Sequence, residues 1–254
     1  MKFQKPLFTA DNGTDAQKAL FDIEEKYQGF DAGEADVIVA LGGDGFMLDV
    51  LNEYNKIGLP VYGINQGTVG FLMNQVKSGN LIDKLNLAEQ TVIHPLRMTA
   101  VKLDGSVDEA LAINEASLLR SGSQAAKVKI IVDGLVRLEE LVCDGVLVST
   151  PAGSTAYNYS AHGPILPIGS NILALTAMAA FRPRRWRGAL IPASAQIELR
   201  VQEPHKRSVS AFADSKEVKQ VKSIQIKSEN KISYRLLFDP GHGLQERILR
   251  EQFF

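Results

Sequence analysis

The sequence predicts an α/β N-terminal domain with a parallel sheet, followed by a β-rich C-terminal domain. Residues 1–94 alternate strand-like apolar runs with runs of helical periodicity, whereas the runs after residue 95 are mostly short and strand-like. The chain has 254 residues, 45% of them hydrophobic, which suffices for two hydrophobic cores. We therefore expect a first domain at 1–94, completed by the tail at 241–254, and a second domain at 95–240.

The first domain begins with a predicted strand at 3–9 and a helix at 14–27 whose apolar residues recur at helical spacing. The run at 37–41, "VIVAL", is apolar throughout, which is typical of a buried parallel strand. A glycine-rich turn and a second helix follow. Apolar residues mark one face of this helix at positions i, i+3, i+4 and i+7, namely Met47, Val50, Leu51 and Tyr54. Gly58 ends the helix, and a short strand at 61–63 comes next.

The second domain contains β-branched or alternating runs that predict strands. These runs lie at 98–103, 128–132, 146–149, 197–201, 224–227 and 233–238. Two segments are predicted to be helical, one at 171–181 and one in the tail at 244–250. We expect the two domains to share an interface, because ligand sites are common at such places.

The segment "LGGDGF", residues 41–46, joins the apolar strand to the second helix. A strand, a glycine turn and a helix start together expose backbone N–H groups, which can hold phosphate. Asp44 is unexpected there because phosphates repel a carboxylate. It could bind a metal, accept a proton from a nucleophilic hydroxyl, or hold a sugar hydroxyl. Alternatively, Asp44 only caps the helix in a tight turn.

A second glycine-rich turn, "GINQGTVGFL" at 63–72, follows the short strand. By itself it is a weak signal that favours a structural loop over a binding loop. Both turns would lie at the carboxyl ends of neighbouring parallel strands, where open α/β sheets bind ligands. The chain has neither the G-x-x-x-x-G-K-[ST] motif of P-loop kinases nor the G-x-G-x-x-G motif of ordinary dinucleotide-binding turns.

The stretch "DGVLVSTPAGSTAYNYSAHGPILP", residues 144–167, combines a strand with a loop rich in hydroxyl, amide and aromatic side chains. Such a loop could recognise a base and a ribose, or it could be an ordinary connection between strands. Upstream, Asn114 and Glu115 follow an apolar run. An amide beside a carboxylate suits the hydroxyls of a sugar, although surface polarity also explains the pair.

Composition excludes several classes of function. The formal net charge of −1 gives no general attraction to nucleic acid or to an anionic membrane. Cys143 is the single cysteine, so neither a disulfide framework nor a cluster of thiolate ligands is available. The N-terminus has no signal-peptide run, and the apolar run at 172–181 is about half a membrane span. We expect a cytoplasmic protein that binds neither nucleic acid nor membrane.

Three motifs, "GGDG" at 42–45, "NE" at 114–115 and the stretch at 144–167, resemble those of bacterial NAD kinases in order and rough spacing. The resemblance extends from about residue 36 to residue 180. It implies that ATP phosphorylates the adenosine 2′-hydroxyl of NAD to give NADP, with Mg²⁺ or another divalent cation bridging oxygens of ATP. It also implies a homodimer or homotetramer in which a neighbouring subunit helps to close the dinucleotide site.

The resemblance assigns roles to individual residues. Asp44 matches the family's catalytic aspartate, which accepts the proton of the 2′-hydroxyl, and Gly45 lines the same pocket. Asn114 and Glu115 match the pair that holds the adenosine and its ribose, while Asp144 matches an aspartate that reaches toward the nucleotide. The stretch that lines the base and sugar pocket is matched by Thr155, Ala156, Tyr157, Asn158, Tyr159 and Ser160. Further positions in the pocket are matched by Phe71, Ala152 and Ala179. Backbone amides that stabilise the transferred phosphoryl group are expected near Gly42 and Gly43.

The chain also departs from the family pattern. Phe46 stands where Thr is more usual, and Ala152 stands where a hydroxyl residue is more usual. The segment "ADSKE" replaces a frequent Asp-Gly pair, which puts a role for Asp214 in doubt. These differences concern substrate preference and the phosphate donor. The cluster Arg182, Arg184, Arg185 and Arg187 could contact phosphate or a partner subunit, or form a solvated turn.

Two other functions share some of these features. A kinase acting on another hydroxyl compound could carry the GGDG turn, but it would not need the Asn114–Glu115 pair or the 155–160 segment. A noncatalytic dinucleotide sensor could keep the pocket, but it would not need Asp44.

Overall fold

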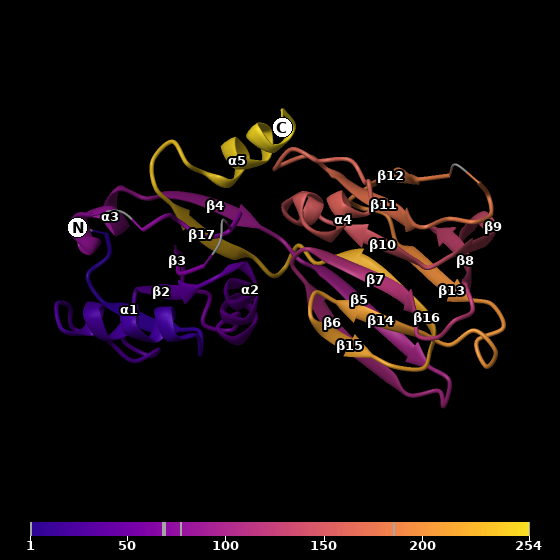
Figure 1. The fold of residues 1–254 in the computed structure, drawn as a ribbon, viewed down its shortest axis with the longest axis horizontal. Coiled ribbons are helices and arrows are strands. Elements are labelled where there is room, and N and C mark those ends of the chain that lie inside the picture. Colours follow the sequence, from indigo (N-terminus) through magenta and orange to yellow (C-terminus); the bar gives the residue numbers. More distant parts are fainter. Residues whose placement is uncertain (1, 68–69, 77, 185, 254) are drawn as a thin grey trace. The chain divides into compact units, whose positions relative to one another are not determined.

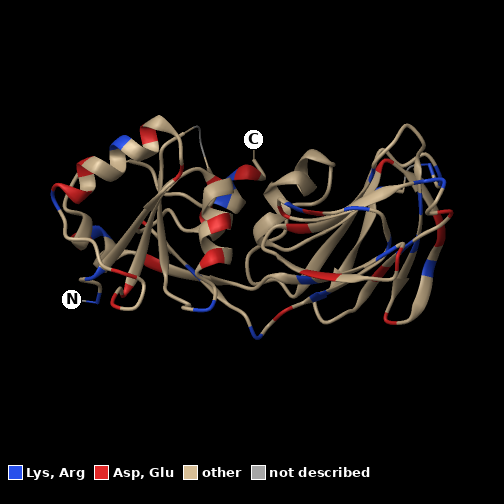
Figure 2. Ribbon diagram, turned by 90° about the horizontal axis from the view of Figure 1, so that it is seen from below, with Lys and Arg blue, Asp and Glu red and all other residues tan. Residues whose placement is uncertain are grey.

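The computed structural model describes residues 2–67, 70–76, 78–184 and 186–253. The chain forms two compact units, one built from Met1–Ile93 with Ile232–Phe254 and the other from His94–Lys231 (Figure 1). Acidic and basic residues occur on both units (Figure 2), in keeping with the formal net charge of −1. Within the described ranges, no helix has the length and apolar character needed to span a membrane.

The first unit contains a five-stranded sheet in the order β1-β2-β3-β17-β4. The strands are β1 (Pro6–Ala10), β2 (Val37–Gly42), β3 (Val61–Asn65), β4 (Glu89–Ile93) and β17 (Tyr234–Phe238). β1, β2, β3 and β17 pair in parallel, whereas β4 pairs antiparallel with β17. The predicted parallel sheet is therefore mixed. β4 is the exception because it is a largely exposed edge strand, and antiparallel edge strands are common on parallel sheets.

The position of β17 corrects the expected boundary of the second domain, which ends at Lys231 rather than at residue 240. The sequence analysis placed the run at 233–238 in the β-rich domain, but this strand lies in the first sheet between β3 and β4. Leu236, Leu237 and Phe238 are at most 1% exposed there. An apolar run that is buried by strands far away in the sequence carries no mark of which sheet it will join.

Helices cover both faces of the first sheet. Ile23 of α1 (Thr14–Glu24) and Leu85 of α3 (Leu81–Leu87) pack with Val39 and Tyr62. A Cβ on the neighbouring Gly63 would meet the methyl of Met47 from α2 (Asp44–Glu53), so α2 covers the opposite face. α5 (Leu244–Glu251) forms in the tail, as predicted. The sequence analysis did not predict α3 or β4.

The second unit contains two six-stranded sheets, in the orders β12-β11-β10-β7-β14-β15 and β6-β5-β16-β13-β8-β9. Their strand pairings are antiparallel. Alternate side chains of the two sheets form one core. The strands are β5 (Leu96–Lys102), β6 (Val107–Ala112), β7 (Glu115–Arg120), β8 (Ala126–Val132), β9 (Leu135–Cys143), β10 (Gly145–Ser149), β11 (Ile172–Met178), β12 (Gly188–Pro192), β13 (Ile197–Val201), β14 (Val209–Ala213), β15 (Lys216–Val218) and β16 (Val221–Ser228).

The predicted helix at 171–181 is wrong, because residues 172–178 form β11. β11 pairs on both sides, with β10 and with β12, and its residues from Leu173 to Met178 are all buried. Burial on both faces removes the alternation that identifies a strand, so a short apolar run of this kind cannot be told from a buried helix by pattern. The predicted strands at 98–103, 128–132, 146–149, 197–201 and 224–227 are confirmed.

Candidate functional site

Asp44 is the first residue of α2, directly after β2 and the two glycines that follow Leu41. Its side chain does not cap α2: the N-cap position is Gly43, and no side-chain capping bond forms there among the described residues. Instead, Oδ2 of Asp44 accepts a hydrogen bond of 2.7 Å from the backbone N–H of Phe71, and Oδ1 accepts one of 2.9 Å from that of Leu72. The carboxylate is therefore held by the second glycine turn.

The two glycine turns lie side by side at the carboxyl ends of β2 and β3. The backbone N–H of Gln66 donates to the carbonyl oxygen of Gly42 at 2.9 Å. A Cβ on Gly70 would lie 2.5 Å from Oδ1 of Asp44, so glycine is what permits this close approach. Thr68 and Val69 of this turn lie outside the described residues. Gly45 is exposed, with open space where a Cβ would be.

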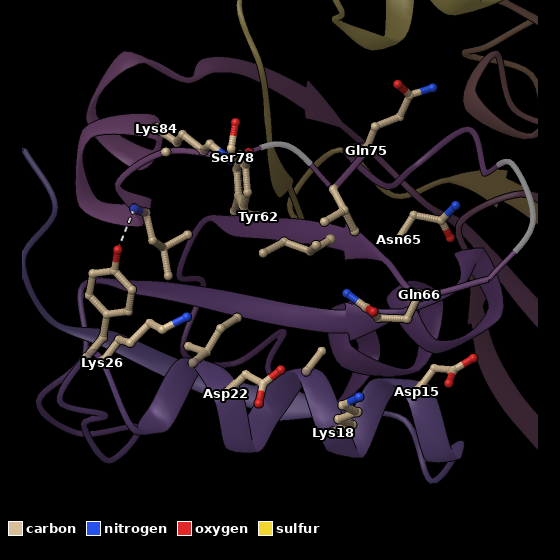
Figure 3. Close-up of a pocket in the computed structure, with 17 residues that line it drawn as sticks. Asp15, Lys18, Asp22, Lys26, Tyr62, Asn65, Gln66, Gln75, Ser78 and Lys84 are labelled. Carbon is tan, nitrogen blue, oxygen red and sulfur yellow. Dashed lines mark hydrogen bonds between the residues drawn. The ribbon is translucent and has the colours of Figure 1, made fainter.

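A cavity of about 700 Å³ lies in the same unit beside α1. Figure 3 shows Asp15, Lys18 and Asp22 on α1, with Tyr62 and Asn65 of β3 on another wall. Its volume falls in the range of pockets for small ligands. The sequence analysis assigned none of these residues to a site. The sequence feature that could have indicated this cavity is the helical spacing of the polar residues of α1 beside its apolar stripe.

In the second unit, Asp214 organises the start of β7. Its Oδ2 accepts from the backbone N–H of Ile113 at 2.7 Å, and its Oδ1 accepts from those of Asn114 and Glu115 at 2.9 and 3.2 Å. Three consecutive amides thus converge on one carboxylate, which fixes the backbone that carries the Asn114–Glu115 pair. The role of Asp214, doubtful from the sequence, is to shape this turn.

Glu115 has an unusual environment for a carboxyl group. Its Oε2 is buried and has no hydrogen-bond partner among the described residues. Burial, and to a lesser extent the nearby charge of Asp214, raise the pKa of Glu115 to about 8. The group is therefore largely protonated at neutral pH and can donate a hydrogen bond. A buried polar atom without a partner is costly, so a ligand hydroxyl at this position would relieve that cost.

The loop after β10 packs on the backbone of Asn114. The N–H of Thr150 donates to the carbonyl oxygen of Asn114 at 2.9 Å, and Oγ1 of Thr150 donates to that of Ile113 at 2.8 Å. A Cβ on Gly153 would lie 2.3 Å from the Asn114 carbonyl oxygen, so glycine is needed there. The structure therefore brings together the "NE" pair and the loop at 150–160, although they are far apart in the sequence.

Asn158 is fully buried, and its amide donates to the carbonyl oxygens of Ser154 at 3.0 Å and Pro164 at 2.9 Å. Its Oδ1 accepts a hydrogen bond of 2.6 Å from Thr176. These bonds use both N–H groups of the amide to hold the loop. Its neighbours are partly or well exposed, namely Thr155, Ala156, Tyr157, Tyr159 and Ser160, whereas Ala152 is buried.

Asp144 lies away from Glu115. Strand β10 pairs with β7 so that Ser149 faces Glu115 and Gly145 faces Leu119. Asp144 precedes Gly145 at the far end of β10. Because a strand rises about 3.3 Å per residue, the backbone of Asp144 lies about 17 Å from that of Ser149. Its Oδ1 accepts from Nε of Arg120 at 2.6 Å. Ala179, which is exposed and follows β11, belongs to the same end because Met178 faces Gly145.

We also searched the described residues for side chains that could bind a metal ion. Among residues 2–67, 70–76, 78–184 and 186–253, no group of three or more His, Cys, Asp or Glu side chains is placed to hold a metal ion. In the arginine cluster, the guanidinium groups of Arg182 and Arg184 lie 5.6 Å from the centroid of the Phe181 ring. Arg185 lies outside the described residues.

Sequence comparison finds one family in both units. The model described as the ATP-NAD kinase N-terminal domain matches residues 3–87, and the model described as the ATP-NAD kinase C-terminal domain matches residues 113–231. An NAD kinase of Cereibacter sphaeroides is 58% identical over 250 residues, covering 98% of each chain. One from Hyphomonas neptunium is 55% identical over 246 residues, covering 97% of this chain and 96% of the relative.

Two solved structures share the fold. A yeast NADH kinase complexed with NADH superposes with a TM-score of 0.79 at 19% sequence identity, covering 100% of this chain and 88% of that one. An NAD kinase from Archaeoglobus fulgidus in complex with ATP superposes with a TM-score of 0.73 at 24% identity, covering 98% of this chain and 97% of that one. At these identities the likeness shows the fold.

Proposed function

This chain belongs to the NAD kinase family, and we propose that its Asp44 accepts the proton of the adenosine 2′-hydroxyl while ATP phosphorylates that oxygen. The enzyme phosphorylates NAD to give NADP, with ATP as the phosphate donor. Identity above 50% to NAD kinases over nearly the whole chain decides against a kinase for another hydroxyl compound and against a noncatalytic sensor.

The fixed position of the Asp44 carboxylate is the observation that supports this role. Each of its oxygens accepts one backbone N–H, and a carboxylate offers about four lone-pair sites, so acceptor capacity remains for a hydroxyl. In the proposed step the 2′-oxygen bonds to the γ-phosphorus, the bond to the leaving ADP oxygen breaks, and the hydroxyl proton moves to Asp44. An ordinary aspartate is a weak base, so the proton moves late, as the new bond forms.

Alignment and charge neutralisation supply most of the rest of the catalysis. We assign the stabilisation of the transferred group to backbone amides near Gly42 and Gly43, at the N-terminal end of α2. Mg²⁺ or another divalent cation, when bound, neutralises charge on the ATP oxygens. Among the described residues no group of three or more His, Cys, Asp or Glu side chains is placed to hold this cation, so we assign no residue as its ligand.

We assign adenosine and ribose recognition to the turn that Asp214 organises. Asn114 supplies an amide, and Glu115 supplies a buried carboxyl oxygen that a ribose hydroxyl can satisfy. Further NAD contacts are proposed for Asp44, Gly45, Phe71, Ala152, Thr155, Ala156, Tyr157, Tyr159 and Ser160. Asn158 is left out because its amide holds the loop.

We propose that Asp144 and Ala179 contact NAD bound by a neighbouring subunit of a homodimer or homotetramer. Their position at the end of β10 remote from Glu115 supports this assignment. One subunit then supplies Asp44 and its partner supplies Asp144 to the same dinucleotide.

The role of Asp44 is tested by Asp44→Asn, which preserves size, removes the charge and turns an NH₂ group toward one of the two backbone N–H donors. We expect NAD affinity to stay close to that of the wild type and turnover to fall by about 10²- to 10⁴-fold, the usual contribution of a positioned proton acceptor. NADP formation from NAD, ATP and Mg²⁺ gives the rate, and calorimetric titration with NAD gives the affinity. Asp49→Asn, an exposed carboxylate on the same helix, is the control. Near-normal turnover of Asp44→Asn would disprove the proposed role.

A further inference from the structure

We infer that Arg247, in the C-terminal helix α5, is a positioning residue that holds the catalytic carboxylate of Asp44 through two peptide groups. The inference rests on the proposed role of Asp44 and extends it to the tail of the chain, which neither matched family domain covers. Arg247 is separated from Asp44 by about two hundred residues of sequence.

The guanidinium of Arg247 binds the backbone of the segment at 70–73. Its Nη1 donates to the carbonyl oxygens of Gly70 at 3.2 Å and Phe71 at 3.0 Å, and also to that of Met73. Its Nε donates to the carbonyl oxygen of His242 at 2.8 Å, which fixes the side chain to the turn before α5. One planar cation therefore gathers several carbonyl groups of a single short segment.

The same segment holds Asp44 from its other side, and the two sets of bonds share their peptide groups. The peptide between Gly70 and Phe71 accepts from Arg247 at its oxygen and donates to Oδ2 of Asp44 at its nitrogen. The peptide between Phe71 and Leu72 accepts from Arg247 and donates to Oδ1. Two parallel relays thus run from one guanidinium to both oxygens of one carboxylate.

Such relays have two physical consequences. A cation at the carbonyl end polarises a peptide group and strengthens the hydrogen bond that its N–H makes, so Arg247 tightens both bonds to Asp44. Holding both peptides in one orientation also fixes where the carboxylate lies. Errors of about 1 Å in the position of a catalytic group can cost about 100-fold in rate.

The surroundings of Arg247 hold it in place. Its guanidinium lies 4.9 Å from the centroid of the Phe238 ring, which supports it from the end of β17. Burial lowers the pKa of Arg247 from its ordinary value, while the charges of Asp44 and Asp239 act in the opposite direction. An arginine remains charged after such a shift because its ordinary pKa is so high.

The first test replaces Arg247 by alanine and by lysine. We expect Arg247→Ala to lower kcat by about 10- to 100-fold and to raise the KM for NAD less, because Asn114 and Glu115 belong to the other unit, whereas Phe71 lies in the segment that Arg247 binds. Arg247→Lys should recover only part of the loss, since an ammonium that reaches the carbonyls at 70–73 cannot also replace the bond that Nε of Arg247 donates to His242. Arg250→Ala is the control: Arg250 is on the same helix, is exposed and pairs with Glu246. It should keep the wild-type kcat.

A double-mutant cycle separates positioning from general support of the fold. If Arg247 acts through Asp44, Arg247→Ala should cost little further turnover in an Asp44→Asn background. Equal fold losses in both backgrounds would overturn the inference, as would a wild-type kcat for Arg247→Ala. If Asp44→Asn alone retains normal turnover, the proposed function fails instead, so the two failures are distinguishable.

Gly70→Ala covers the case in which Arg247→Ala does not fold. The added Cβ would lie 2.5 Å from Oδ1 of Asp44, and the substitution removes neither Arg247 nor the carbonyl oxygens that it binds. We expect kcat to fall about 10-fold or more while the thermal unfolding midpoint stays near that of the wild type. A wild-type kcat for Gly70→Ala would show that the relay does not control the carboxylate, and would overturn the inference.

Discussion

At the scale of single residues, the carboxylates of this protein are set apart by what surrounds them. Asp44 and Asp214 each accept two or more backbone N–H groups, whereas the Oε2 of Glu115 is buried without a partner among the described residues. The sequence analysis predicted Asp44 and Glu115 from their motifs. It could not predict that Asp44 is held by two backbone N–H groups while Glu115 is largely protonated, because tertiary contacts and burial decide that difference.

Glu115 makes stability depend on pH. Its pKa is raised from 4.5 to about 8 in the folded protein, so the folded state holds more protons between these values. The contribution of Glu115 to the free energy of unfolding is therefore largest below about pH 4.5, and it decreases as the pH rises toward 8. Glu115→Gln removes this loss. We expect the variant to gain about 2–4 kcal/mol relative to wild type between pH 5 and pH 9.

Urea unfolding of the apo protein at pH 5 and pH 9 measures this gain. Glu139→Gln, whose exposed carboxylate pairs with Lys129, is the control and should show no such difference. An equal stability change of Glu115→Gln at both pH values would contradict the prediction.

At the scale of elements, turns between strands place the polar groups. Asp214, at the end of β14, orders the start of β7 by accepting from the backbone of Ile113, Asn114 and Glu115. The sequence analysis predicted neither β7 nor β14 as a strand, and the two pair across a long stretch of sequence. Local pattern identifies some strands, whereas the partner of a strand depends on packing.

Asp214→Asn tests this turn. An amide keeps one acceptor oxygen but turns an NH₂ group toward backbone N–H donors, which should cost about 1–3 kcal/mol of stability. The same change displaces Asn114 and Glu115, so we expect the KM for NAD to rise about 10-fold or more. Steady-state kinetics and thermal unfolding measure both effects. Glu217→Gln on the adjacent β15 is the control. An unchanged KM would show that the turn does not position the NAD contacts.

At the scale of the whole molecule, the proposed oligomer predicts complementation between inactive subunits. Asp44→Asn and Asp144→Ala each remove one proposed contribution to a shared site. In a mixed oligomer, the subunit with intact Asp44 can meet a partner with intact Asp144, which restores some sites. We expect the coexpressed variants to be more active than either variant alone, up to about a quarter of wild type for random dimers.

The mixture needs its own controls. Variants purified separately and mixed without exchange of subunits should stay inactive, and an Asp44→Asn sample coexpressed with itself sets the background. Activity of the coexpressed pair no higher than that background would refute a shared site, while analytical ultracentrifugation reports whether an oligomer forms.

The sequence by itself determined the strand, glycine turn and helix around Asp44, five of the twelve strands of the second unit (β5, β8, β10, β13 and β16), and the family to which the motifs belong. These features follow from local hydrogen bonding and side-chain periodicity, which a short window of residues expresses. Tertiary structure alone decided which sheet β17 joins, the strand character of β11, the hydrogen bonds of Asn158, and the hydrogen bonds between Arg247 and the segment that holds Asp44. Arg247 and Phe71 are 176 residues apart, and Asp214 and Asn114 are 100 apart. Contacts over such separations depend on how buried surfaces fit together, and no local pattern of residues encodes that fit.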